Sequence, residues 1–284
     1  MIKAKVTDNG FEGILFNGDG TKDKVVIVMS GSNGGMSITR REAEFYHSNG
    51  IPALALALFK TKQTSPDLDR VPIDYIEKAI IWLKHKGFVK IGVDGTSKGS
   101  EAALLAASMF EDLSFVIARV PSYFVSEGLA GRGKSKHPSG TSCWSYKGKA
   151  FPFAPYNQRE FNILKMFFRE RELHIITFNI DKDVTPDTVI PVEKIKAPIL
   201  LMSSENDEVW PSYESSLYIM RRLEENGFEY PAEHISYKFM SHALLTRLST
   251  VYRLAFKTER NHPRECAEER IKMSNKLLNW IESL

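Results

Sequence analysis

The chain has 284 residues, 43% of them hydrophobic and 26% charged, which is the composition of an ordinary globular protein and not of a disordered, collagen-like or membrane protein. Its 38 Lys and Arg residues against 35 Asp and Glu residues give a net charge of +3, and these charges are scattered. The sequence therefore predicts no nucleic-acid partner. The longest apolar run, residues 51–59, is far shorter than the roughly 18 residues of a membrane-spanning helix, so we expect no membrane association.

The two cysteines, Cys143 and Cys266, lie far apart and belong to no Cys/His cluster. This spacing argues against a disulfide framework and against a structural metal site. The first residues lead into no apolar segment of the kind that a signal peptide carries. We therefore expect an unexported protein of the reducing cytoplasm.

The chain begins with a pattern typical of an antiparallel sheet edge. Apolar residues alternate with polar ones from Ile2 to Val6, and Asn9-Gly10 predicts a two-residue hairpin turn before a second strand over 11–16. Residues 25–29 are apolar at every position and rich in valine and isoleucine, which indicates a strand buried inside a parallel sheet. A glycine-rich loop, residues 30–35, follows directly.

Strand-like and helix-like patterns alternate along the rest of the chain. Strands are expected at 53–58, 91–93, 115–120, 199–202 and 235–237, and helices at 38–47, 76–87, 100–109, 212–226 and 263–284. In the last helix, Ala267, Ile271, Leu278 and Ile281 are expected on the buried side. This alternation predicts an α/β fold with right-handed βαβ units and a mostly parallel sheet covered by helices on both faces.

Residues 121–190 break this rhythm. The segment is rich in proline, glycine, lysine and aromatic residues, and its one clear helical pattern lies near 158–172. Long connections in compact domains are usually functional, so we interpret it as a lid or pocket wall inserted into a single domain over 1–284. A mere surface insertion is the alternative.

The sharpest chemical signal is the pentapeptide 95–99, Gly-Thr-Ser-Lys-Gly, between a predicted strand and a predicted helix. A serine nucleophile sits on a strained turn of this kind, and the flanking glycines let neighbouring backbones approach closely. The pattern predicts that Ser97 is a nucleophile. The alternative is an incidental serine in a glycine turn.

A serine nucleophile needs a base, and in folds with this turn the acid and then the histidine follow it along the chain. The seven histidines are His47, His85, His137, His174, His234, His242 and His262. The first four precede the predicted acid, whereas His234 enters a predicted strand and His262 abuts the start of the last helix. His242 follows a strand end and is therefore the predicted base.

Three carboxylates compete for the role of acid in the loop after the strand at 199–202: Glu205, Asp207 and Glu208. Asp207 is favoured because it leaves room for a turn before Trp210-Pro211. Its role would be to hold the imidazole tautomer and stabilise the imidazolium. Asp181 and Asp183 are weaker candidates.

The oxyanion of an acyl-transfer reaction needs hydrogen-bond donors. The backbone N–H of Lys98, directly after the nucleophile, is one candidate. The glycine-rich loop offers a second from Ser32 or Asn33, and the sequence leaves this choice open.

Segments spread over most of the chain carry a family resemblance. They are 95–101 with its Ser-Lys-Gly core, 30–36, 68–71, 142–148 and 206–212. At these residues the sequence resembles the C-terminal catalytic domain of the acyl-CoA thioesterase and bile acid-CoA:amino acid N-acyltransferase family, within the α/β-hydrolase superfamily. The resemblance implies an α/β-hydrolase fold and a triad of Ser97, Asp207 and His242.

The resemblance also implies a reaction. Members with serine at this position are typically thioesterases, whereas amino-acid-transferring members usually carry cysteine, so Ser97 favours water as acyl acceptor. Two features depart from the family: the chain has no room for the N-terminal β-sandwich of larger members, and the region around His242 lacks the Gly-His pair and a proline-rich tail. These departures bear on the identity of the substrate.

The resulting hypothesis is hydrolysis of an acyl ester or acyl-CoA thioester through an acyl-Ser97 intermediate, with no metal and no cofactor. Basic residues of the insertion are candidates to contact coenzyme A phosphates: Arg132, Lys134, Lys136, Lys147 and Lys149. The alternatives are a carboxylesterase or dienelactone-type hydrolase, an N-acyltransferase, and a catalytically silent binding protein. The sequence leaves the oligomeric state open, a homo-oligomer included.

Overall fold

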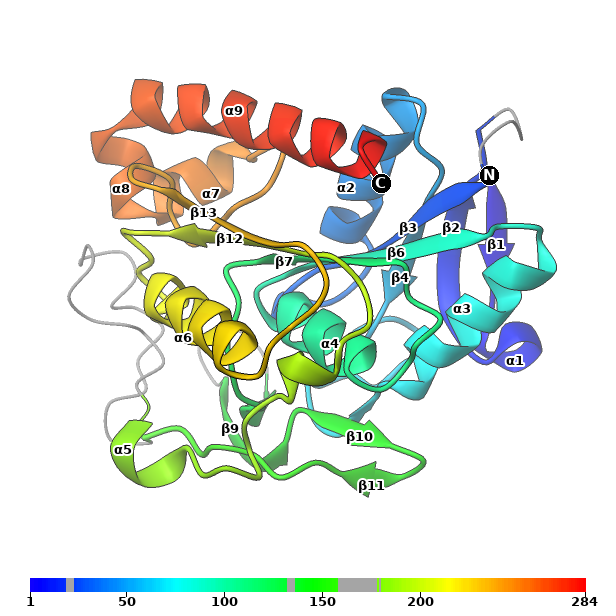
Figure 1. Ribbon diagram of the computed structural model, residues 1–284, viewed down its shortest axis with the longest axis horizontal. Coiled ribbons are helices and arrows are strands. Elements are labelled where there is room, and N and C mark those ends of the chain that lie inside the picture. Colours follow the sequence, from blue (N-terminus) through cyan, green and yellow to red (C-terminus); the bar gives the residue numbers. More distant parts are fainter. Residues whose placement is uncertain (19–22, 132–135, 158–177, 179) are drawn as a thin grey trace.

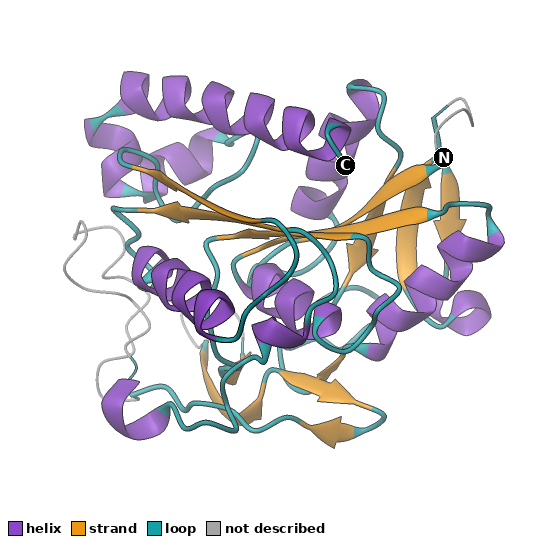
Figure 2. Cartoon of the chain, viewed as in Figure 1, coloured by secondary structure: helices purple, strands orange, loops and turns teal. Residues whose placement is uncertain are grey.

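Eight strands form one sheet in the order β1-β2-β4-β3-β6-β7-β12-β13 (Figures 1 and 2). Their bounds are β1 Ile2–Ala4, β2 Glu12–Phe16, β3 Lys24–Met29, β4 Ala53–Ala57, β6 Lys90–Thr96, β7 Phe115–Arg119, β12 Ile199–Ser204 and β13 Ala232–Tyr237. The computed structural model describes residues 1–18, 23–131, 136–157, 178 and 180–284. From β4 to β13 in this sheet order, neighbouring strands pair in parallel, as the apolar runs of the inner strands predict.

The antiparallel edge at β1 and β2 is confirmed, with Ile2 opposite Leu15. The predicted two-residue turn between these strands is wrong. One helical turn, α1 (Val6–Asn9), stands there and ends at Gly10 with φ 76°. The side chain of Asn9 accepts a hydrogen bond from the backbone N–H of Lys5, and this local bond favours a helical turn over a tight hairpin.

Helices cover both faces of the sheet, as predicted. Helices α2 (Ser37–Ser48) and α9 (Pro263–Glu282) lie on one face, and α3 (Asp74–His85), α4 (Lys98–Ala107) and α6 (Ser212–Glu225) lie on the other (Figure 1). Successive side chains of β3 point to opposite faces of the sheet. Val26 and Val28 pack with α2 and α9, whereas Ile27 packs with α3, α4 and α6. The alternation of side chains along a strand explains this division.

The predicted buried side of the last helix is partly wrong. Ile271 is 63% exposed, and the buried positions of α9 are Cys266, Arg270, Met273, Leu277, Trp280 and Ile281. The buried stripe includes an arginine, which an apolar pattern does not reveal. Its guanidinium is held by the partners described below.

The described part of the 121–190 insertion consists of short strands and one helical turn. They are β8 (Glu127–Ala130), β9 (His137–Ser142), β10 (Trp144–Tyr146), β11 (Lys149–Ala150) and α5 (Ile180–Asp183). Strand β10 pairs with β5 (Val71–Pro72), and Phe124, Leu129 and Trp144 join the core on the α4 side of the sheet. The expected helix near 158–172 lies outside the described residues.

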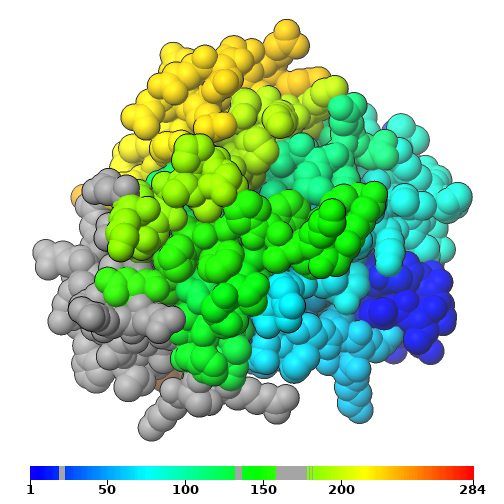
Figure 3. Space-filling model, turned by 90° about the horizontal axis from the view of Figure 1, so that it is seen from below, coloured from blue at the N-terminus to red at the C-terminus, as the bar shows by residue number. Residues whose placement is uncertain are grey.

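The insertion extends the fold on one side of the molecule. In Figure 3 its green segment crosses the middle of the face seen from below, between the yellow α6 region and the blue and cyan N-terminal region. The described part of the insertion thus packs onto the α4 layer and continues its core.

Two short helices between β13 and α9 were not predicted, α7 (Thr250–Ala255) and α8 (Lys257–Asn261). A 3-10 turn, η3 (Val192–Lys194), precedes β12. In the described part of the chain, no helix has both the length and the apolar character needed to cross a membrane.

Candidate active site

Ser97 occupies the turn from β6 into α4 with φ 59° and ψ −122°, a conformation that L residues rarely adopt. The flanking glycines make this turn sterically feasible. A Cβ on Gly95 would lie 2.0 Å from the carbonyl oxygen of Gly99, and a Cβ on Gly99 would lie 2.7 Å from the carbonyl oxygens of Met29 and Ser30. The pattern of two glycines around a serine therefore has a direct structural cause.

Three residues from distant parts of the sequence meet at the carboxyl ends of the parallel strands. His242 Nε2 lies 2.8 Å from Ser97 Oγ, and His242 Nδ1 lies 2.9 Å from both carboxylate oxygens of Asp207. Ser97 follows β6, Asp207 follows β12 and His242 follows β13. All three residues are buried. This arrangement suits transfer of the Ser97 proton to an oriented imidazole.

Asp207 is fixed by backbone donors as well as by His242. Its Oδ1 accepts hydrogen bonds from the N–H groups of Val209 at 2.9 Å and Trp210 at 3.1 Å. Burial alone would raise the pKa of Asp207, but the facing His242 and these donors lower it below its usual value. The carboxyl group is therefore an anion in the folded protein.

Trp210 covers the ring of His242. Its ring meets the His242 ring edge-on at a centroid distance of 5.1 Å, and its Nε1 donates to the carbonyl oxygen of Val120 over 3.0 Å. Because Val120 directly follows β7, this bond connects the acid loop to the start of the insertion. The sequence analysis used Trp210 only to mark the end of a turn.

The competing candidates have other partners. Glu205 accepts from Ser236 Oγ, and Glu208 accepts from the backbone N–H of His242 over 3.3 Å. His234 lies in β13 as expected and contacts Ser203 Oγ. His262 stands at the start of α9, where its side chain makes no cap hydrogen bond.

Asp181 and Asp183 belong to α5 in the insertion. In the described residues, Asp207 is the only acidic side chain bonded to the His242 ring.

The glycine-rich loop lies against the nucleophile. A Cβ on Gly31 would lie 2.7 Å from Ser97 Cβ and 3.0 Å from Ser97 Oγ. The N–H of Gly34 donates to the carbonyl oxygen of Gly31 over 3.1 Å and closes a turn with Ser32 and Asn33 at its centre. We refer to residues 31–34 as the oxyanion turn.

The backbone N–H groups of Ser32, Asn33 and Lys98 have no acceptor among the described residues. Unpaired N–H groups beside a nucleophile suit the binding of an oxyanion. The geometry of the oxyanion turn leaves Ser32 and Asn33 both available.

A buried ionic network lies behind the histidine loop, defined here as residues 241–246. Arg119 binds both carboxylate oxygens of Asp94 at 2.9 and 2.7 Å, Glu42 at 2.7 Å and the carbonyl oxygen of Leu244 at 3.0 Å. Glu42 in turn accepts from the N–H and the hydroxyl of Thr246. The network therefore holds the loop that carries His242.

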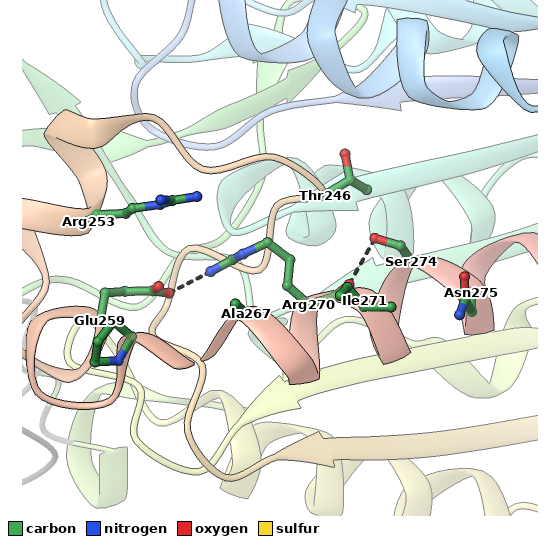
Figure 4. A pocket seen from close by; sticks show the side chains of 9 residues that line it. Thr246, Arg253, Glu259, Ala267, Arg270, Ile271, Ser274 and Asn275 are labelled. Atoms are coloured by element: carbon green, nitrogen blue, oxygen red, sulfur yellow. Dashed lines mark hydrogen bonds and ion pairs between the residues drawn. The ribbon is translucent and has the colours of Figure 1, made fainter. Parts of the chain in front are cut away.

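A second arginine holds the same loop from α9. Arg270 donates to the carbonyl oxygens of Ala243 and Leu245 at 3.2 and 2.7 Å, and it pairs with Glu259 at 2.7 Å. Figure 4 shows Arg270 extending from α9 toward Glu259 in a groove of about 340 Å³. None of the catalytic candidates lines this groove, and Arg270 contacts the histidine loop through its carbonyl groups and, by way of Glu259, through Ser241 Oγ.

Glu101 connects α4 to the insertion. It accepts hydrogen bonds from the backbone N–H of Ser126 at 2.8 Å, Trp144 Nε1 at 2.9 Å and Cys143 Sγ at 3.1 Å. Lys98 Nζ lies 3.2 Å from the same carboxylate. The residues directly after Ser97 therefore anchor the insertion next to Ser97 itself.

Sequence reasoning missed these supporting residues, although a signal was present. Asp94 and Arg119 are charged residues inside two otherwise apolar strands, and both are fully buried. Buried charges are rare unless they are paired, so two of them in neighbouring strands indicate a buried ion pair. Within the described residues there is no group of His, Cys, Asp and Glu side chains that could hold a metal ion.

A parallel sheet with a strained serine turn after its middle strand, and a histidine beyond its last strand, defines the α/β-hydrolase class. The chain belongs to the family described as BAAT / acyl-CoA thioester hydrolase C terminal, whose model matches residues 71–247. The family predicted from the sequence segments is thereby confirmed.

Curated relatives agree with this assignment. The chain is 27% identical over 222 residues to the peroxisomal succinyl-coenzyme A thioesterase of Mus musculus, covering 76% of this chain and 48% of that protein. It is 23% identical over 211 residues to the mitochondrial acyl-coenzyme A thioesterase 2 of Homo sapiens, covering 72% of this chain and 40% of that protein. The chain thus matches at most about half the length of these relatives.

Solved structures show the same fold. An esterase of Pyrococcus furiosus superposes with a TM-score of 0.55 at 16% identity, covering 99% of this chain and 98% of that chain. An acylaminoacyl peptidase of Pyrococcus horikoshii superposes with a TM-score of 0.54 at 13% identity, covering 96% and 39%, respectively. The predicted α/β-hydrolase fold is confirmed.

Proposed function

We propose that this protein hydrolyses acyl thioesters of the acyl-CoA type through an acyl intermediate on Ser97. The hydrogen-bonded series from Asp207 through His242 to Ser97, next to the unpaired N–H groups of the oxyanion turn, carries this proposal. Membership of the acyl-CoA thioester hydrolase family and the printed activities of its relatives support the choice of a thioester.

In the acylation step, His242 Nε2 accepts the Ser97 proton as Oγ attacks the thioester carbonyl carbon. The carbonyl oxygen becomes an oxyanion that accepts hydrogen bonds from the N–H of Lys98 and from an N–H of the oxyanion turn. In related chemistry one such donor is worth about 3–4 kcal/mol in the transition state. Collapse of the tetrahedral intermediate breaks the carbon–sulfur bond, and His242 returns the proton to the leaving thiolate.

Deacylation repeats these steps with water. His242 takes a proton from the water as its oxygen attacks the acyl carbon, and the same N–H groups bind the second oxyanion. Breakdown of this intermediate releases the carboxylic acid and restores Ser97. Throughout, Asp207 holds Nδ1 protonated and stabilises the imidazolium without accepting the proton.

A paired substrate panel tests the proposal. Acyl-CoA thioesters of graded chain length and oxygen esters of the same acids are supplied to the wild-type protein and to Ser97→Ala. We expect thioester hydrolysis with a higher kcat/KM than ester hydrolysis, and its loss in Ser97→Ala. A fluorophosphonate probe labels the wild type and fails to label the variant, whereas Ser108→Ala behaves as wild type.

Each alternative gives a different result. Preferential cleavage of the oxygen esters would identify a carboxylesterase or lactone hydrolase. Amide formation that outruns hydrolysis when glycine or taurine is added would identify an N-acyltransferase. An absence of labelling in the wild-type protein would identify a silent binding protein and overturn the enzymatic proposal.

A further inference from the structure

Two lysines from separate parts of the chain bind consecutive carbonyl groups of the oxyanion turn. Lys136 Nζ donates to the carbonyl oxygen of Ser32 over 2.9 Å, and Lys60 Nζ donates to that of Asn33 over 3.2 Å. Lys136 directly precedes β9 in the insertion, whereas Lys60 follows β4. The insertion and the central sheet thus each place an ammonium group at the same turn.

Neither ammonium has an acidic partner. Among the described residues, Lys60 and Lys136 each have one hydrogen-bond acceptor, a backbone carbonyl, and no carboxylate within 4.0 Å. Burial and the neighbouring charges of Lys60 and Lys98 lower the pKa of Lys136 to about 8, and Asp67 offsets this only in part. Lys60 is exposed and Lys136 is half-buried, and a half-buried ammonium with no carboxylate partner among the described residues suits an anionic ligand.

The two lysines lie close to the nucleophile. Ser32 directly follows Gly31, and a Cβ built on Gly31 would lie 3.0 Å from Ser97 Oγ. Standard backbone dimensions then limit the distance from Lys136 Nζ to Ser97 Oγ to roughly 13 Å. An anionic group on a substrate whose reactive carbonyl sits at Ser97 can reach the ammonium group within this length.

We propose that Lys136 and Lys60 form a subsite for an anionic group of the substrate, either a carboxylate at the far end of the acyl chain or a phosphate of the coenzyme A leaving group. This inference rests on the proposed acyl-thioester hydrolysis and specifies the substrate class of that site. Each ammonium carries three donors and uses one on the oxyanion turn, so donors remain for the anion. Binding there supplies a counter-charge that none of the described residues provides, and it selects for charged substrates.

Four kinds of thioester separate the two sources of the anion. Butanoyl and hexanoyl groups are compared with 3-carboxypropanoyl and 5-carboxypentanoyl groups, each attached to coenzyme A and to N-acetylcysteamine, which has no phosphate. The variant is Lys136→Met, and Lys272→Met, on the exposed side of α9, is the control. Thermal unfolding followed by circular dichroism verifies that both variants are folded.

We expect Lys136→Met to raise KM by about 10- to 100-fold for substrates that bear the recognised anion, the range for loss of a hydrogen bond to a charged group. An effect that follows the carboxylate on both leaving groups assigns the anion to the acyl chain. An effect that follows coenzyme A with both acyl types assigns it to the phosphate. An equal loss on all substrates, the neutral N-acetylcysteamine thioesters included, or no loss on any, would overturn the subsite.

A pH series supplies a readout that a purely structural lysine would not change. Between pH 7.5 and 9.5 the wild-type KM for the anionic substrate should rise as Lys136 loses its proton, since its pKa is about 8. The groups that face it are Lys60, Lys98 and Asp67. Lys136→Arg keeps its charge over this range, so its KM should stay constant. A rise of equal size in Lys136→Arg would contradict the subsite.

Failure of the subsite can be told apart from failure of the proposed function. If the wild type cleaves no thioester, the methyl esters of the same neutral and carboxylate-bearing acids are tested for discrimination. Calorimetric binding of the product acids to the wild type and Lys136→Met requires no turnover. The subsite has no role if the wild type and Lys136→Met both bind monocarboxylates and dicarboxylates with equal affinity and if the two proteins also bind coenzyme A equally well.

Discussion

Arg119 binds the carbonyl oxygen of Leu244 over 3.0 Å, two residues beyond the catalytic candidate His242. The same guanidinium binds Asp94, which lies in the strand that leads to Ser97. One buried side chain therefore connects the strand before Ser97 to the loop that carries His242. The distance between Ser97 and His242 depends on this connection as well as on the sheet.

Arg119→Met should be among the most destabilising substitutions in the chain. It leaves Asp94 and Glu42 buried without their cation, and loss of one partner of a buried ion pair costs about 3–5 kcal/mol. Urea unfolding measures the loss. The control is Arg222→Met, which breaks a partly exposed pair with Glu193 and should cost less than about 1 kcal/mol. Equal losses in the two variants would contradict the structural role of Arg119.

Asp207→Asn should lower kcat with little change in fold. An asparagine fits the same space but no longer selects the productive tautomer of His242 or stabilises its imidazolium, an effect of about 10⁴ in the serine protease triad. Steady-state kinetics with the preferred thioester measures it. Glu205→Gln in the same loop should remain near wild-type activity. A larger loss in Glu205→Gln than in Asp207→Asn would reassign the acid.

Gly31→Ala should reduce catalysis through a steric contact. The added Cβ would stand 3.0 Å from Ser97 Oγ, so the oxyanion turn must move away from the nucleophile. We expect kcat to fall by about 100- to 1,000-fold, since loss of an oxyanion donor costs about 3–4 kcal/mol. Ser32→Ala keeps its backbone N–H and should retain near wild-type kcat. Unchanged kcat in Gly31→Ala would place the oxyanion donor elsewhere.

Glu208 should make the protein less stable as the pH rises through the weakly acidic range. Burial and the neighbouring Asp207 raise the pKa of Glu208 to about 7. The folded state therefore binds this proton more tightly than the unfolded state, and the free energy of unfolding falls between about pH 4.5 and pH 7 by at most about 1.4 kcal/mol per pH unit.

Glu208→Gln removes that titration. Urea unfolding of the wild type and the variant at pH 5, 6, 7 and 8 should show a smaller pH-dependent loss in the variant. Glutamine provides one acceptor where Glu208 receives N–H groups from both His242 and Thr258, so a uniform loss at every pH is also expected. Parallel pH curves for the two proteins would contradict the raised pKa.

Much of the fold follows from local sequence patterns. The apolar residues 25–29 and the periodic 76–87 segment form a buried strand and a helix because their side chains repeat with the period of the element itself. The helical turn α1 and the arginine on the buried side of α9 were missed. In both places a specific polar contact overrides the apolar pattern.

The sequence by itself determined the family, the parallel α/β architecture and the strained serine turn, because the spacing of glycines and apolar residues encodes them locally. It also narrowed the catalytic candidates to Ser97, Asp207 and His242, whose roles remain predictions. Only the tertiary structure decided which side chains support that site. These contacts are the ion pairs of Arg119 and Arg270, the bonds of Glu101 and the hydrogen bond from Lys136 to the oxyanion turn, and they join strands, loops and helices far apart in the chain. The energies of these contacts depend on burial and on distances across the fold, which no local sequence pattern encodes.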